Sequence, residues 1–222
     1  MLQQLCSLTE MASCINFTDE ASDSVRRKWT VDGTYTARSS YRCQFEGALR
    51  TNDKELIWSA KAAPRAKTFL WLATRERCMT ADNLAIRGIP HNPNCPLCST
   101  APETAAHLLT VCPYSAELWS SVIIKLGPPF SALPVATTAA NNDGSLRSSW
   151  TSQLRALPGP AHRNTWRSAI CLIAWMLWKE RNARIFNATH CSPRQVVSRI
   201  MDEARCWSAA RIHQLDRLFE PP

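Results

Sequence analysis

Four residues in the stretch 95–112 limit what this chain can fold into more than any other feature of the sequence. Cys95 and Cys98 enclose a Pro-Leu pair, His107 follows after eight residues, and Cys112 follows after four more. Two cysteines three positions apart can point both sulfurs at one ion, while a His and a Cys from a second segment complete a tetrahedron. We therefore predict that these four residues bind one Zn2+ ion. Because four protein ligands leave no open position for a reactive water, the predicted zinc is structural.

Two other candidate ligands lie close to this pattern. His91 stands just before the Cys95–Cys98 knuckle, but Pro93 and the compact cysteine pair favour a loop position for it. Cys78 ends an apolar helical segment, where packing into a core is the common role of a cysteine. For the four pattern residues, the alternative is a set of core thiols with one hydrogen-bonded His, which their spacing disfavours.

The composition favours a helical globular protein. A chain of 222 residues with 45% hydrophobic residues can bury one sizeable core or two smaller ones. Glycine is scarce at 6 residues and tryptophan abundant at 9, which favours long elements and bulky cores over turn-rich β-structure. We therefore expect a mainly α fold, completed by a short N-terminal β-hairpin, a small zinc knuckle and a C-terminal helical hairpin.

The ten cysteines raise the alternative of a secreted, disulfide-bonded protein. The first residues, Met1–Cys6, lack the basic and apolar regions of a signal peptide. We therefore expect reduced thiols and an intracellular location, in the nucleus or the cytoplasm, rather than secretion. The longest apolar run, Ala169–Trp178, is about half of the roughly 20 residues that cross a bilayer, so no membrane association is expected.

The N-terminal part predicts a lead-in, a hairpin and a helix. Residues 1–24 are acidic and without periodicity, so we expect them to form a loosely ordered lead-in. From Lys28 to Ala37, two short β-prone runs flank an Asp-Gly pair, which supplies the positive φ angles of a two-residue hairpin turn. On the segment that follows, apolar residues recur every four positions and predict a buried helical face: Tyr41, Phe45 and Leu49.

Proline, glycine and capping residues mark the ends of the next helices. Pro64 can begin a helix because the N–H group that proline lacks would have no partner in the first turn. Thr80 is a candidate N-cap for a short helix that leads to the knuckle. Pro113 begins a longer amphipathic helix, which Gly127 ends.

The C-terminal part predicts a linker and two helices. The stretch 127–160 is rich in Pro, Ala, Thr, Ser and Asn, which is typical of a linker. Bulky residues at helical spacing then predict one long helix over 161–186. Ser192 and Gln195 form a capping-box pattern at the start of a last helix, and the short turn before it predicts an antiparallel pair. The predicted divisions of the chain are 1–24, 25–126, 127–160 and 161–222.

Ordered motifs over residues 27–126 resemble one known family. The first motifs are a Trp-Thr-Val-Asp-Gly run, an Ile-Trp pair, an Ala-Pro-Arg-Ala-Lys helix start and a capped Asp-Asn-Leu segment, at Lys28–Tyr35, Ile57–Trp58, Ala63–Trp71 and Thr80–Leu84. The segments with the Cys and His residues follow, at Cys95–Cys98, Glu103–Leu109 and Cys112. The set resembles the zinc-binding domain found downstream of the polymerase in plant non-LTR (LINE-type) retrotransposons. The segment Ala174–Phe186 is similar to the helix that follows this domain in such polyproteins. The resemblance implies a retrotransposon-derived zinc-binding chain whose partners are RNA, DNA or other retroelement proteins.

The resemblance does not bring a catalytic activity with it. The chain contains no pair of adjacent aspartates, such as the family's polymerase uses, and its length leaves no room for an upstream polymerase or endonuclease. A following RNase H domain is also absent from it. We therefore expect a module that is not an enzyme.

The positive charge of the chain lies mainly outside the metal pattern. Of the net charge of +8, residues 25–94 contribute 13 Lys and Arg against 6 Asp and Glu, whereas residues 95–126 contribute 1 against 2. Because Lys and Arg dominate the affinity of proteins for phosphate backbones, we predict weak, non-specific binding of RNA or DNA through Arg65, Lys67, Arg75 and Arg77. The alternatives are a structural or protein-interaction module with ordinary surface charge, and a retroelement remnant without a selected function.

Overall fold

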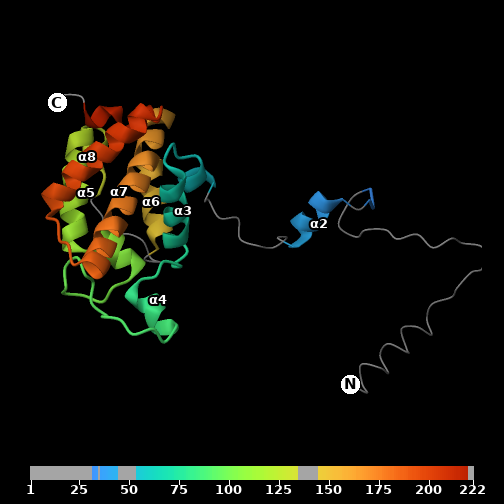
Figure 1. Cartoon of the computed structure of the whole chain (residues 1–222). Coiled ribbons are helices and arrows are strands. Elements are labelled where there is room, and N and C mark those ends of the chain that lie inside the picture. The colour runs from blue at the N-terminus through green and yellow to red at the C-terminus, as the bar shows by residue number, and fades with distance from the viewer. Residues whose placement is uncertain (1–31, 35, 45–53, 135–144, 220–222) are drawn as a thin grey trace, which may run out of the picture. The chain divides into compact units, whose positions relative to one another are not determined.

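The computed structural model describes residues 32–34, 36–44, 54–134 and 145–219, which are coloured in Figure 1. They belong to two compact units, 1–50 and 51–222, and each unit is described by itself. Within the described ranges the regular structure is helical and no strand is present. A single isolated antiparallel bridge joins Asn94 to Pro102 there. The prediction of a mainly α fold is therefore confirmed.

The predicted N-terminal β-hairpin is wrong over the residues that the structure describes. Gly33 has the expected positive φ of 69°, but Thr34 and Thr36 are not in a strand, and helix α2 (Ala37–Gln44) begins at the last residue of the expected second strand. The reason is a reciprocal cap: the Thr36 N–H group donates to Ser39 Oγ (3.1 Å), and the Ser39 N–H group donates to Thr36 Oγ1 (3.0 Å). The first predicted strand, at 28–31, lies outside the described residues.

The predicted buried face of this first helix is not found at Tyr41. Its side chain is 66% exposed, so the prediction that it packs in a core is wrong. The other two members of that face, Phe45 and Leu49, lie outside the described residues.

The second unit begins with a short π-helical turn, η1 (Lys54–Trp58), followed by α3 (Pro64–Ala73) and α4 (Ala81–Ile86). Both helices start where Pro64 and Thr80 predicted them to start. Gly88, with a φ of 66°, follows the end of α4 and turns the chain toward the knuckle.

After the knuckle, the π-helical turn η2 (His107–Val111) leads directly into α5 (Pro113–Leu126). Pro113 occupies the first position of α5, and Gly127 ends it with a φ of 65°. The buried side of α5 carries the residues that the periodicity predicted: Leu118, Trp119, Val122, Ile123 and Leu126.

Part of the stretch predicted as a linker is helical and packed. The 3-10 turn η3 (Phe130–Ala132) buries Phe130 completely, and α6 (Leu146–Ala156) buries Trp150 and Leu154. Leu146, Trp150 and Leu154 recur every four residues, which places them on one helical face despite the Ser- and Thr-rich composition around them. Residues 145–156 therefore belong to the core of the second unit, while the remaining domain boundaries stay predictions.

The long helix α7 (Gly159–Asn187) is the centre of the second unit. It contacts α3, α6 and the last helix, α8 (Pro193–Ala209), as Figure 1 shows. The predicted capping box at Ser192 and Gln195 is confirmed, and a 3-10 turn, η4 (His213–Leu218), packs back on α7 and α8. None of the helices in the described ranges has the length and apolar character needed to cross a membrane.

Candidate metal centre

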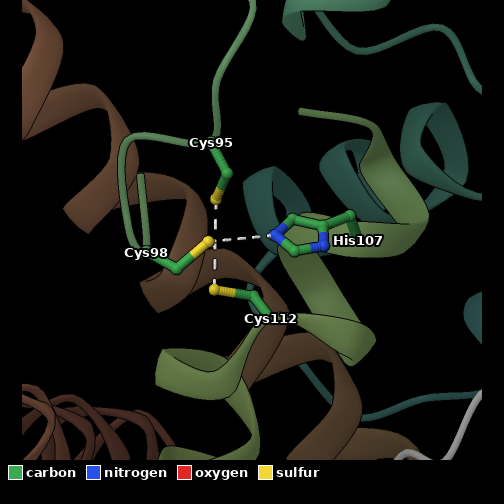
Figure 2. Close-up of side chains that lie close together, drawn as sticks. All are labelled: Cys95, Cys98, His107 and Cys112. Carbon is green, nitrogen blue, oxygen red and sulfur yellow. Dashed lines mark hydrogen bonds between the residues drawn. The ribbon is translucent and has the colours of Figure 1, made fainter. Parts of the chain in front are cut away.

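Cys95, Cys98, His107 and Cys112 converge at one point of the second unit. Their ligand atoms all lie within 4.8 Å of one another, and their side chains point toward one another in Figure 2. The Cys95 and Cys112 sulfurs are 4.0 Å apart, and the Cys98 sulfur lies 3.3 Å from His107 Nε2. Zinc–sulfur bonds of about 2.3 Å in a tetrahedron place two sulfurs about 3.8 Å apart. The spacing and the donor set therefore fit a four-coordinate zinc ion.

The knuckle is a tight turn that orients the first two sulfurs. The Ser99 N–H group donates to the Cys95 carbonyl oxygen (2.7 Å), and the Cys95 N–H group donates to the Ala101 carbonyl oxygen (2.8 Å). Within the turn, the backbone N–H dipoles of Leu97 and Cys98 act to lower the pKa of Cys95, because each places a positive dipole end toward the sulfur.

The second pair of ligands comes from the start of α5 and the turn before it. The His107 N–H group donates to Thr104 Oγ1 (3.0 Å), and the Cys112 N–H group donates to the His107 carbonyl oxygen (2.8 Å). Cys112 is the N-cap of α5, and the backbone N–H dipoles of Tyr114 and Ser115 act to lower the pKa of its thiol. A helix N-terminus favours a negative charge at this position, so Cys112 is suited to act as a thiolate ligand.

Burial and a mutual hydrogen bond shift the pKa values of the Cys95 and Cys112 thiols. Cys95 and Cys112 are fully buried, whereas Cys98 and His107 are half-buried. The hydrogen bond from the Cys95 thiol to the Cys112 sulfur, together with burial, raises the pKa of Cys95, and the same bond lowers the pKa of Cys112. A metal ion that takes both sulfurs as ligands must displace the proton they share.

The two other candidate ligands lie where the sequence predicted them. His91 is exposed in a loop, with Nδ1 2.7 Å from the Ile89 carbonyl oxygen, and does not belong to the cluster. Cys78 is buried at 5% exposure, and burial raises the pKa of its thiol to about 12. A thiol of this acidity is a packing group rather than a ligand at neutral pH.

A buried ion pair that the sequence did not predict joins α7 to the segment between the ligand pairs. Arg181 donates from Nε and Nη2 to the two carboxylate oxygens of Glu103, each at 2.8 Å, and both side chains are at most 4% exposed. The same carboxylate accepts the Ala81 N–H group at the start of α4 (2.8 Å). The pair thus fixes α7, α4 and the stretch between Cys98 and His107 to one another.

A second arginine of α7 contacts the knuckle itself. Arg184 donates from Nη1 to the carbonyl oxygens of Pro96 and Leu97, both at 3.0 Å. Both arginines lie in the segment 174–186, which the sequence analysis noted for its resemblance to the helix after the zinc-binding domain. That resemblance did not predict which groups the two arginines contact.

The four basic residues predicted to contact nucleic acid do not all face solvent freely. Arg65 pairs with Glu203 of α8 (3.0 Å), and Lys67 Nζ donates to the Trp58 carbonyl oxygen (3.4 Å). The Arg75 guanidinium lies 4.8 Å from the centre of the Trp71 ring, and its side chain is exposed. Arg77 is also exposed, in the turn after α3.

The metal pattern and the motifs around it have a known counterpart. Residues 35–119 match the family model described as zinc-binding in reverse transcriptase. The match confirms the resemblance predicted from the motifs, and it includes all four clustered residues. The family is a zinc-binding one, which agrees with the donor set of the cluster.

One relative extends the similarity beyond this range. A protein of Arabidopsis thaliana named "Putative ribonuclease H protein" is 26% identical over 180 residues. The alignment covers 78% of this chain but only 27% of the relative's length. No solved structure matches this chain significantly.

The buried Glu103–Arg181 pair should be a main source of stability for this part of the fold. Arg181→Met leaves the Glu103 carboxylate buried without its partner, so we expect the free energy of unfolding to fall by about 3–5 kcal/mol. The matched control is Arg205→Met, which removes an exposed pair with Asp202 and should cost about 1 kcal/mol or less. Urea titrations at a fixed zinc concentration measure both values. Equal losses in the two variants would contradict the structural role of the buried pair.

Proposed function

We propose that this chain is a non-catalytic, zinc-binding module of a retrotransposon-derived protein. One structural Zn2+ ion is bound by Cys95, Cys98, His107 and Cys112. The observation that carries the proposal is the convergence of these four donors within 4.8 Å, inside the range that matches the zinc-binding family. Zinc supplies a cross-link between the knuckle and the start of α5, in addition to the side-chain contacts that Arg184 makes with both.

The residues around the cluster support a structural zinc ion rather than a catalytic one. All four donors come from the protein, and backbone N–H groups stabilise the Cys95 and Cys112 sulfurs. A catalytic zinc ion needs an open coordination position for water or substrate, and this donor set leaves none. We therefore propose a role in folding and presentation for this part of the chain. The ribonuclease H name belongs to a relative of which this chain spans 27%, and it assigns no activity here.

We further propose weak, non-specific binding of RNA or DNA by the second unit. Support comes from the charge of this unit, whose 20 Lys and Arg against 12 Asp and Glu account for the net charge of +8. Among the predicted contacts, Arg65, Arg75 and Arg77 are exposed and are the first choice for phosphate contact, although Arg65 also pairs with Glu203. Lys67 is half-buried and contributes mainly to the positive potential.

The contacts of Arg65 with Glu203 and of Lys67 with the Trp58 carbonyl oxygen favour a second candidate function. If these side chains serve to join α3 to α8 and η1, the module is a purely structural or protein-interaction domain. The two candidates share the zinc ion and differ in their response to nucleic acid, so a binding titration separates them.

Metal analysis of the purified protein tests the zinc site. We expect about one zinc ion per chain, and we expect Cys95→Ser to lose it together with part of the helical circular dichroism signal, because metal binding and folding are coupled. Cys206→Ser is the matched control, since Cys206 is an exposed cysteine of α8 outside the cluster. Full folding of the wild-type protein without any bound metal would contradict the proposal.

A salt titration of nucleic acid binding tests the second proposal. We expect single-stranded RNA or DNA to bind at low salt, with an affinity that falls steeply as salt rises. In a plot of the logarithm of the binding constant against the logarithm of the salt concentration, the double variant Arg75→Gln and Arg77→Gln should have a slope shallower by about one to two units. Each lost phosphate contact reduces the slope by nearly one unit. Arg205→Gln serves as a control for loss of a single exposed charge. An absence of binding at low salt would favour the structural module.

A further inference from the structure

We infer that Arg184 is a positioning residue of the metal site, and that it couples metal binding to the docking of the turn between α7 and α8. The inference rests on the zinc binding proposed above and adds a role for residues outside the cluster. It is carried by the contacts that one guanidinium makes with three separate segments.

The first set of contacts orients the knuckle. Arg184 donates to the carbonyl oxygens of Pro96 and Leu97, which belong to the two peptide units between Pro96 and Cys98. In a planar trans peptide the C=O and N–H groups point in opposite directions. Holding the two oxygens toward Arg184 therefore turns the N–H groups of the same peptide units away from it. These two peptide units span the turn between Cys95 and Cys98, so fixing their orientation fixes how the knuckle presents its two sulfurs.

The second set of contacts fixes the guanidinium in this position. Arg184 Nε donates to Glu180 Oε1 (2.8 Å), one turn earlier on α7, and the guanidinium lies 4.6 Å from the centre of the Tyr114 ring on α5. The Arg184 side chain is 12% exposed and that of Glu180 is 2% exposed. Because the two charges largely neutralise each other, Arg184 acts through the geometry of its fork more than through its net charge.

The third set of contacts reaches the turn before α8. Arg184 Nη2 donates to the Cys191 carbonyl oxygen (3.0 Å), which also accepts the Tyr114 hydroxyl (2.8 Å). The Cys191 N–H group donates to Glu180 Oε1 (2.9 Å). Arg184, Tyr114 and Glu180 thus hold both backbone groups of Cys191. Cys191 lies directly before Ser192, the N-cap of α8.

These contacts make metal binding and turn docking reciprocal. A guanidinium that holds the knuckle in its ligating geometry favours metal binding, and a metal that fixes the knuckle must favour the docked guanidinium by the same factor. Loss of the fork should therefore weaken metal binding, and loss of the metal should loosen the backbone at Cys191.

Zinc affinity measured by competition with a chelator tests the inference. We expect Arg184→Lys, which keeps the charge but loses the fork, to weaken zinc binding by about 10- to 100-fold, as partners of metal ligands typically do when changed. Arg199→Lys, at an exposed position of α8, is the matched control and should bind zinc as the wild type does. Glu180→Gln should also weaken binding, and its effect should not add to that of Arg184→Lys, because the two side chains act as one unit.

Hydrogen exchange of the wild-type protein gives a second measurement that needs no variant. Removing zinc with a chelator should speed exchange of the Cys191 amide by a factor similar to the loss of affinity in Arg184→Lys. Zinc binding by Arg184→Lys within about twofold of the wild type, or unchanged exchange at Cys191, would overturn the coupling while leaving the zinc site intact. A wild-type protein that binds no zinc would overturn the proposed function and this inference with it.

Discussion

Three sulfur atoms and one imidazole nitrogen lie within 4.8 Å of one another, where the knuckle, η2 and the start of α5 meet. Thiols at this distance repel one another once they ionise, so the arrangement is stable as thiolates only with a cation between them. In this structure the Cys95 thiol donates a hydrogen bond to the Cys112 sulfur (4.0 Å). The cluster therefore constrains how the chain folds, and the helices beside it supply the contacts that hold its two halves in place.

Helix α7 links this constraint to the rest of the core. Its apolar positions are buried in the middle of the unit, and two arginines near its C-terminal end reach the segment that carries the ligands. Arg181 fixes the stretch between the ligand pairs through Glu103, and Arg184 fixes the knuckle. A helix far along the chain thus completes a site whose ligands all lie in residues 95–112.

Local signals allowed the metal ligands and most helix ends to be predicted from sequence. Prolines at the first positions of α3 and α5, and the capping box of α8, act within one turn of chain, so their effect can be predicted without a fold. The hairpin failed because Thr36 and Ser39 cap a helix where β-prone residues suggested a strand. The Glu103–Arg181 pair could not be predicted, since its members are 78 residues apart and no local pattern joins them.

The account of function depends on one claim, that these four side chains bind zinc together. Zinc X-ray absorption spectroscopy of the purified protein tests it most directly, because it measures the identity and distance of the ligand atoms. The account predicts three sulfur atoms at about 2.3 Å and one nitrogen at about 2.0–2.1 Å. A shell of oxygen and nitrogen atoms alone, or one of four sulfur atoms, would contradict it.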